Sequence, residues 1–406
     1  MKIKKIFITL LLGIIFLTNC SFVLAVNETE EKPDDFPSIS ANAYVILDNK
    51  TNKILYSQNE TKKMYPASTT KIMTALLVLE HCKLDEVAKA SYNAVMSIPD
   101  GYSTAYIQVG EELTVEQLLY LLLIPSANDA ANVLAEHVGG SVDSFVSMMN
   151  TKANELGLTN THFTNAYGKH DENHYTTAAD LATIMKNCLK DENFRKIDGS
   201  STCKIPATNK YGARTYTSTN ELIVPSYKNF YEYLTAGKTG TTTQAKQCLV
   251  ASSFHDDLEL LCVVLGSEKR FGDARNLFDY AYSHYSIKNI VKNKDVVSNI
   301  EVKNATPDTK SLDLLVCEDI HALINNSTPI SEIKPEITLN EDISAPIEEG
   351  DVLGTAKYKV EGVEYTTNLI ASHSVEKSKL LLYILCGVIV LAVLFIIVKI
   401  KKSHHR

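Results

Sequence analysis

The sequence lacks any regular spacing of cysteine. It contains eight cysteines but no Cys-x-x-Cys pair, so their pattern predicts neither a zinc site nor a disulfide framework. Most are expected to be buried thiols that pack like small hydrophobic side chains. They are Cys20, Cys82, Cys188, Cys203, Cys248, Cys262, Cys317 and Cys386.

An excess of positive charge is also missing. The 406 residues carry a formal net charge of -8, which argues against a nucleic-acid-binding surface. No internal repeat is present in the sequence. The basic residues that stand out are gathered at the two ends of the chain: Lys2, Lys4, Lys5, Lys399, Lys401, Lys402 and Arg406.

The first 25 residues have the organisation of a secretory signal peptide. A lysine-rich start precedes the apolar run 6–17, and residues 23–25 fit a cleavage site. A weak lipoprotein-like box at 17–20 and an uncleaved anchor are alternatives that stay open. Residues 26–38, acidic and with prolines, predict a flexible linker. Since export permits disulfides, one such bond also stays open.

The other end of the chain predicts a membrane span. Residues 380–398 contain no charge and are long enough to cross a bilayer as a helix. The basic tail at 399–406 is expected to stay cytoplasmic, which places everything before the span outside the cell. A buried core helix is the alternative, but a segment that is apolar on every face has little left to pack against.

The residues between the two ends predict an α+β domain at 39–287, an antiparallel sheet flanked by helices and closed by the two ends of the domain. After about Lys288 the helical periodicity disappears, and alternating runs predict a small, sandwich-like β-domain at 288–373. Strands are expected at 43–48, 54–58, 232–235, 249–254, 258–265, 312–317 and 355–360, and helices at 71–84, 115–124, 129–137, 143–156 and 270–285.

Three short motifs occur in order: Ser68-Thr-Thr-Lys71, Ser126-Ala-Asn128 and Lys238-Thr-Gly240. Each is weak alone, because Ser-x-x-Lys occurs four times and Ser-x-Asn five times, and only Lys-Thr-Gly is unique. Each also has a purely structural alternative: a helix cap for the first two, and a surface lysine before a turn for the third.

Context singles out the first motif. Pro66 and Ala67 lead into the apolar helix expected at 71–84, so Ser68 lies at a helix start. Residues three apart share one face of a helix, and Ser68 and Lys71 can therefore touch. Free backbone N–H groups and the positive end of the helix dipole suit a developing oxyanion there.

Together, the three motifs resemble those of the penicillin-binding protein and β-lactamase superfamily. The chain is similar to the low-molecular-mass serine D-alanyl-D-alanine carboxypeptidases from about Ser40 to Tyr285, and the trailing β-domain is common in that family. Further segments typical of it surround the motifs: 66–75, 106–114, 119–131, 157–165, 174–180 and 263–266, the last leading to Arg270.

The resemblance implies hydrolysis of the terminal D-Ala-D-Ala bond of peptidoglycan stem peptides, without metal or organic cofactor, and inhibition by β-lactams. It implies that Ser68 is the nucleophile, Lys71 its base and Ser126 the donor of a proton to the leaving amine. The backbone N–H groups of Ser68 and Thr241 would form the oxyanion hole. Substrate binding would fall to Asn128, Lys238, Thr239, Gly240, Thr241 and Arg270.

Two other functions stay open at this point. A β-lactamase would need rapid deacylation, and the sequence between the second and third motifs offers no convincing Glu-x-x-x-Asn loop for it. A non-catalytic β-lactam sensor would usually carry signalling segments before its binding domain, where this chain has only an export signal. Release of D-alanine separates the three functions.

Overall fold

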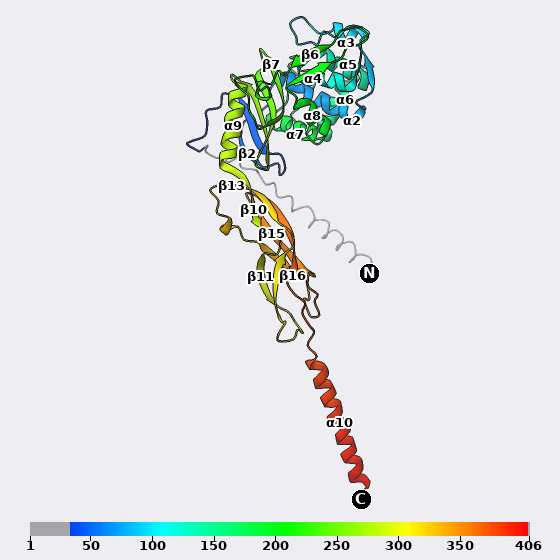
Figure 1. Ribbon diagram of the computed structural model, residues 1–406, viewed down its shortest axis with the longest axis vertical. Helices are drawn as coiled ribbons and strands as arrows, with labels where there is room; N and C mark the ends of the chain where they lie inside the picture. The colour runs from blue at the N-terminus through cyan, green and yellow to red at the C-terminus, as the bar shows by residue number, and fades with distance from the viewer. Residues whose placement is uncertain (1–32, 405–406) are drawn as a thin grey trace, which may run out of the picture. The chain divides into compact units, whose positions relative to one another are not determined.

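The computed structural model describes residues 33–404. The predicted signal peptide and most of the predicted linker therefore lie outside the described residues. From Ser38 onward the chain clusters as one unit, within which a mixed α/β region is followed by a β-rich region and a long apolar helix (Figure 1).

The centre of the first region is a five-stranded antiparallel sheet in the order β2-β1-β9-β8-β7. The first strand of the region, β1, therefore pairs with β9, a late one, which confirms a sheet closed by both ends of the domain. Every residue of β1 is buried, because the strand lies between β2 and β9 and helices cover both faces of the sheet. The strands are β1 (Ala43–Asp48), β2 (Ile54–Gln58), β7 (Leu234–Thr242), β8 (Lys246–His255) and β9 (Leu258–Ser267).

Helices cover both faces of this sheet (Figure 1). Helix α9 (Arg270–His284) packs on β8 and β9 from one side, and α7 (Ala178–Cys188) contacts the same strands beside a helical cluster. The cluster contains α2 (Lys71–His81), α3 (Tyr92–Met96), α4 (Val115–Leu123), α5 (Asn128–Gly139), α6 (Val142–Glu155) and α8 (Glu192–Asp198). Two short hairpins, β3–β4 (Val87–Lys89, Glu112–Thr114) and β5–β6 (Thr202–Ile205, Arg214–Thr217), and a 3-10 turn η2 (Glu221–Ile223) complete the region.

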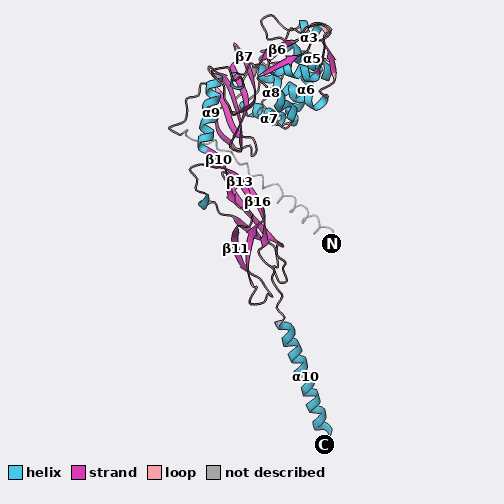
Figure 2. Cartoon of the chain, in the orientation of Figure 1, coloured by secondary structure: helices cyan, strands magenta, loops and turns pink. Residues whose placement is uncertain are grey.

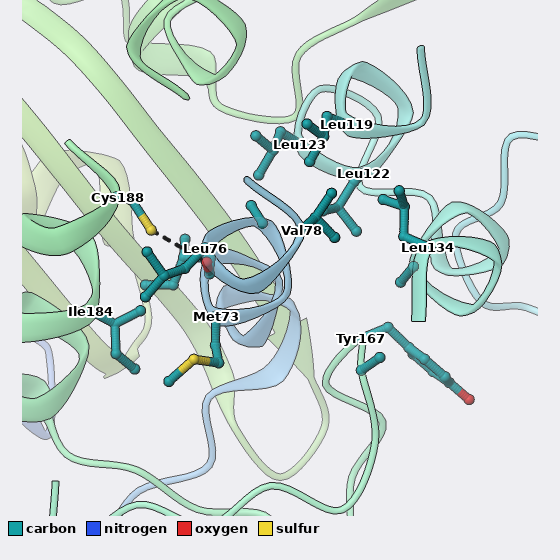
Figure 3. Close-up of a cluster of buried hydrophobic side chains, with 14 of the residues drawn as sticks. Met73, Leu76, Val78, Leu119, Leu122, Leu123, Leu134, Tyr167, Ile184 and Cys188 are labelled. Carbon is teal, nitrogen blue, oxygen red and sulfur yellow. Dashed lines mark hydrogen bonds between the residues drawn. The ribbon is translucent and has the colours of Figure 1, made fainter. Parts of the chain in front are cut away.

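Helix α2 runs through the middle of the helical cluster. Its first eight residues are all buried, which matches the strongly apolar sequence that predicted it. Figure 3 shows its side chains among those of α4, α5 and α7, and the Cys188 thiol donates to the carbonyl of Ile72 at 3.3 Å. A helix surrounded in this way holds its first residue, Lys71, in a fixed position.

One expected strand boundary is wrong. The sequence suggested that Lys-Thr-Gly follows a strand at 232–235, whereas the motif lies inside β7, with Thr239 opposite Leu249 and Gly240 opposite Cys248 on β8. Glycine and lysine depress strand propensity in a sequence window, but cross-strand pairing in the sheet outweighs that local preference.

The region after α9 is built from strands (Figure 2). Its five-stranded sheet has the order β11-β12-β16-β15-β14, and β10 pairs with β13. Alternation along β12 buries Leu312, Leu314 and Val316, as expected for a strand with one face in a core. The strands are β10 (Tyr285–Val291), β11 (Val296–Glu301), β12 (Ser311–Val316), β13 (Ile320–Asn325), β14 (Glu336–Leu339), β15 (Val352–Val360) and β16 (Val363–Ala371), with a 3-10 turn η3 (Ile330–Glu332).

The last described element is helix α10 (Leu380–His404). Its segment Leu382–Ile400 is the one helix in the described part of the chain that is long and apolar enough to cross a membrane. Its described side chains are exposed rather than packed in a core, unlike those of α2.

Candidate active site

Ser68 lies on a tight turn in front of α2, not in α2 itself. The 3-10 turn η1 (Ala67–Thr70) begins with Ala67 at a φ of 49°, in the left-handed region that alanine seldom occupies. The Thr69 and Thr70 hydroxyls donate to the carbonyls of Pro66 and Ala67 at 2.8 Å each and hold the turn. Backbone held in such a conformation is characteristic of functional sites.

The buried side chain of His174 holds the η1 turn through a hydrogen bond to Thr70. The Thr164 amide donates to Nδ1 of His174 at 3.0 Å, so Nε2 carries the proton and donates to the Thr70 hydroxyl at 2.8 Å. Burial lowers the pKa of His174 to about 3. The imidazole is therefore neutral, and a continuous chain of hydrogen bonds runs from Thr164 to Ala67.

Two glycines allow other segments to approach the turn closely. A Cβ on Gly240 would lie 2.9 Å from the Ser68 nitrogen, and one on Gly168 would lie 1.8 Å from the Ala67 carbonyl oxygen. Gly168 also has a φ of +91°. Strand β7 and the loop that contains Gly168 can touch the nucleophile turn only because neither residue has a side chain.

Lys71 is fully buried beside Ser68. Its Nζ lies 3.1 Å from the Ser68 hydroxyl, 2.5 Å from Oδ1 of Asn128 and 3.0 Å from the carbonyl oxygen of Tyr167. Burial first, and then the charge of Lys238, hold the pKa of Lys71 well below its usual range. A neutral amine can donate to the Asn128 and Tyr167 oxygens and still offer its lone pair to the Ser68 hydroxyl.

The second motif places two polar side chains at the start of α5. Asn128 is the first residue of the helix and reaches Lys71. The alternative that Ser126 caps α5 is wrong, because the cap position is Ala127. Ser126 has a φ of 63°, and its buried hydroxyl has no hydrogen-bond partner within the described residues. That hydroxyl is therefore available to a ligand.

The third motif places Lys238 on β7, near the Arg270 side chain at the start of α9. Lys238 is fully buried and donates to the carbonyl of Thr239 at 3.0 Å, which excludes the surface-lysine alternative. Arg270, at the start of α9, donates from one guanidinium nitrogen to the Gly240 carbonyl at 2.8 Å and to the Thr241 hydroxyl at 2.6 Å. The Arg270 and Lys238 charges interact, and that repulsion contributes to a lowered pKa of Lys238.

Asp198 is a residue of this site that the sequence did not reveal. It ends α8 and is fully buried, and its charge and that of Lys238 stabilise each other. Burial nevertheless raises the pKa of Asp198 and lowers that of Lys238. An aspartate before a glycine in the sequence looks like an ordinary helix end, so only the packing of α8 against β7 shows its role.

Asp129 is a second residue that the sequence did not reveal. Its buried carboxylate accepts hydrogen bonds from the amides of Ala105 and Ile107 at 3.0 Å, and so ties the 103–107 segment to the start of α5. Its charge also opposes the lowering of the Lys71 pKa. Of the nine predicted site residues, Ser68, Lys71 and Asn128 are in direct contact, and Ser126 lies two positions before Asn128 in the chain. The other five lie on β7 and at the start of α9, where Arg270 hydrogen-bonds to Gly240 and Thr241; they are Lys238, Thr239, Gly240, Thr241 and Arg270.

The fold and this arrangement of serine, lysines and asparagine define the class of penicillin-binding serine enzymes. A 27% identical solved structure, penicillin binding protein 5 from Haemophilus influenzae, superposes with a TM-score of 0.63 over 85% of this chain and 99% of that one. A 25% identical one, PBP3 from Streptococcus pneumoniae, gives 0.67 over 84% of this chain and 100% of that one.

Sequence comparison identifies the family. The D-alanyl-D-alanine carboxypeptidase model, peptidase S11, matches residues 27–269, and the C-terminal domain model of penicillin-binding protein 5 matches 285–377. D-alanyl-D-alanine carboxypeptidase DacF of Bacillus subtilis is 33% identical over 88% of this chain and 91% of its own length, and DacC of Escherichia coli 29% over 82% and 83%. The chain belongs to the serine-type D-alanyl-D-alanine carboxypeptidase family, which confirms the predicted resemblance.

Proposed function

We propose that this protein hydrolyses the terminal D-Ala-D-Ala bond of peptidoglycan stem peptides through an acyl-enzyme on Ser68, and that β-lactams acylate the same residue. The observation that carries the proposal is the contact of Lys71 with Ser68 at 3.1 Å inside a site where burial and Lys238 disfavour a charged amine. A serine hydroxyl is a weak nucleophile and needs such a base.

Acylation begins when Lys71 takes the proton of Ser68 and the oxygen attacks the carbonyl between the two D-alanines. The developing oxyanion accepts hydrogen bonds from the backbone N–H groups of Ser68 and Thr241. The close approach of Gly240 to the Ser68 nitrogen supports this pairing, because it places β7 directly beside the nucleophile.

The substrate carboxylate is bound on the β7 side of the cleft. Lys238 and Arg270 supply positive charge and the Thr239 hydroxyl a neutral donor, and a charge-assisted hydrogen bond to a carboxylate is among the stronger ones. The Thr239 hydroxyl lies 2.7 Å from that of Thr219, which orients it. The Asp198 charge opposes the lowering of the Lys238 pKa and so favours the protonated lysine that binds an anion.

The leaving amine receives its proton from Ser126, whose hydroxyl is buried and unpaired within the described residues. Asn128 holds both the substrate amide and Lys71. Ser126 regains a proton from Lys71, which returns Lys71 to the neutral amine. Water then hydrolyses the ester: Lys71 accepts a proton from the attacking water and gives it to the Ser68 oxygen as the ester bond breaks. Each of these steps uses side-chain and backbone groups of the chain itself.

The same proposal includes an anchored, external enzyme. Helix α10 crosses the membrane once, the tail at 399–406 stays cytoplasmic, and the domains at 39–287 and 288–373 lie outside. The apolar segment Leu382–Ile400 and the lysines around it support this topology. Protease added to intact protoplasts is expected to remove the external domains and leave the tail; protection of those domains, with digestion in lysed cells, would contradict it.

The activity is tested with the full-length protein in detergent and a pentapeptide ending in D-Ala-D-Ala. We expect stoichiometric release of D-alanine by the wild type and by Ser201→Ala, which alters another Ser-x-x-Lys match, but none by Ser68→Ala. Rapid turnover of penicillin would instead favour a β-lactamase. Acylation without any release of D-alanine would favour a sensor.

A further inference from the structure

A second group of chemically active side chains lies at the opposite end of the catalytic helices. It comprises Cys82, Glu86 and His137, whose sulfur, carboxylate and imidazole ligand atoms all lie within 4.8 Å of one another. The Nε2 atom of His137 is 3.2 Å from Oε2 of Glu86. Their spacing in the sequence gives no sign of this cluster, because His137 is brought to the other two only by folding.

The cluster lies at the C-terminal ends of helices α2 and α5. Helix α2 begins with Lys71 and has Cys82 as its C-terminal cap, while α5 begins with Asn128 and carries His137 in its last turn. Glu86 lies between them, just before β3. The two helices that present catalytic residues at their first turns therefore meet again at their last turns.

We propose that Cys82, Glu86 and His137 form a Zn²⁺ site. Thiolate, imidazole and carboxylate are the three ligand types of zinc, and the presence of sulfur disfavours calcium and magnesium. Three protein ligands leave a fourth tetrahedral position for water. Zinc bonds of about 2.0–2.3 Å place neighbouring ligand atoms about 3.3–3.7 Å apart in a tetrahedron. Nε2 of His137 and Oε2 of Glu86 already lie 3.2 Å apart, so any further approach falls on the partly exposed Cys82 side chain.

A neighbouring group is placed to orient one ligand. The amide of Lys83 donates to Oε1 of Glu86 at 2.7 Å, which leaves Oε2 directed at the cluster. Binding exchanges the thiol proton of Cys82 for the metal, and the proton passes to solvent.

A bound zinc would join the ends of α2 and α5. Anything that binds the native state and not the unfolded state raises stability by mass action, and a metal that bridges three elements does so. The site is remote from Ser68, since it lies at the far end of an eleven-residue helix. Zinc is therefore expected to raise the melting temperature and leave the rate of penicillin acylation unchanged.

The test uses full-length, metal-free protein in detergent with a non-chelating phosphine reductant. His404 and His405 are replaced by glutamine in every sample, so that the tail adds no site. Zinc is titrated against a chromophoric chelator, and cobalt is used as a spectroscopic probe. We expect one equivalent, a thiolate-to-cobalt charge-transfer band, and at least a tenfold loss of zinc affinity in Cys82→Ser and in His137→Gln.

Cys317→Ser removes another partly exposed thiol and provides the matched control, with affinity equal to that of the starting protein. Circular dichroism of each variant reports whether it is folded. The proposal is overturned if no stoichiometric binding occurs, or if Cys82→Ser and His137→Gln bind zinc as the control does. Because the readout is metal binding, this result does not depend on the proposed function.

Discussion

The regions before and after Tyr285 bury different kinds of side chain. Among residues 33–404, every buried polar or charged side chain lies before Tyr285 except Thr367. The core of the later region is apolar, with Leu312, Leu314 and Leu369 among its fully buried members. Burying a polar or charged side chain costs free energy unless it is paired or hydrogen-bonded. The concentration of such side chains in the first region therefore indicates a functional role for some of them.

The first region itself contains two kinds of buried charge. Glu111 and Arg214 form a direct ion pair, so neither charge is buried without a partner of opposite sign. Lys71, by contrast, is surrounded by neutral oxygens and repelled by Lys238. These surroundings disfavour the protonated form of the lysine, which supports a role as the catalytic base rather than a purely structural one.

The largest expected effect separates the two buried lysines of the site. Lys71→Arg keeps a basic side chain but fixes it as a cation without a lone pair, because arginine does not deprotonate. The penicillin acylation rate constant is expected to fall by about 100- to 10,000-fold, the usual contribution of a general base. Stopped-flow acylation measures it without interference from hydrolysis.

Lys238→Arg is the matched control for that change. It keeps the charge that a carboxylate needs, so part of the acylation rate is expected to survive with altered geometry. Acylation of Lys71→Arg within about tenfold of wild type would assign the base to Lys238 or Ser126 instead.

The apolar core of the later region predicts that a substitution there affects only that region. Leu314→Ala opens a cavity in an apolar core, so the unfolding free energy of that region should fall by about 2–5 kcal/mol. The penicillin acylation rate is expected to stay within about twofold of wild type. Denaturant unfolding followed alongside acylation checks both, and a parallel loss of acylation would show that the two regions are not independent.

His174 makes the first region sensitive to acid. Its pKa is about 3 in the folded protein against 6.5 in the unfolded chain, so the unfolded state binds more protons below pH 6.5. Stability is therefore present above pH 6.5 and lost as pH falls toward 3, by about 2 kcal/mol at pH 5.

The measurement is unfolding free energy against pH for wild type and His174→Gln. The variant is less stable at neutral pH, but its curve between pH 6.5 and 5 is expected to be flatter than that of wild type by the same amount. Parallel curves would mean that another group carries the acid sensitivity.

The smallest expected effect concerns Asp198. Asp198→Asn removes the negative charge that helps Lys238 keep its proton, so the pKa of Lys238 falls further. We expect kcat/KM for the peptide to drop by about tenfold at neutral pH, mostly through KM, as one charge-assisted contact weakens. The alkaline limb of the pH profile should shift to lower pH; an unshifted limb would exclude this role.

The sequence was sufficient where local pattern and chemistry agree. The apolar run after Lys71 predicted α2, and the order of the three motifs predicted the family. Strands at both ends of a mostly helical stretch predicted the α+β domain, and alternating runs predicted the trailing β-domain. The strand through Lys238 was underestimated, because the pairing of β7 with β8 depends on residues that follow it in the chain. The roles of Asp198 and His174 depend on an electrostatic interaction with Lys238 and on a hydrogen bond to Thr70, across 40 and 104 positions that no local window contains.

The role of Ser68 as the nucleophile is tested most directly by the site of penicillin acylation. Intact mass after brief exposure, followed by peptide mapping, is expected to show one adduct, located on Ser68 and absent from Ser68→Ala. An adduct on Ser201 or any other residue, or no adduct on folded protein, would contradict it.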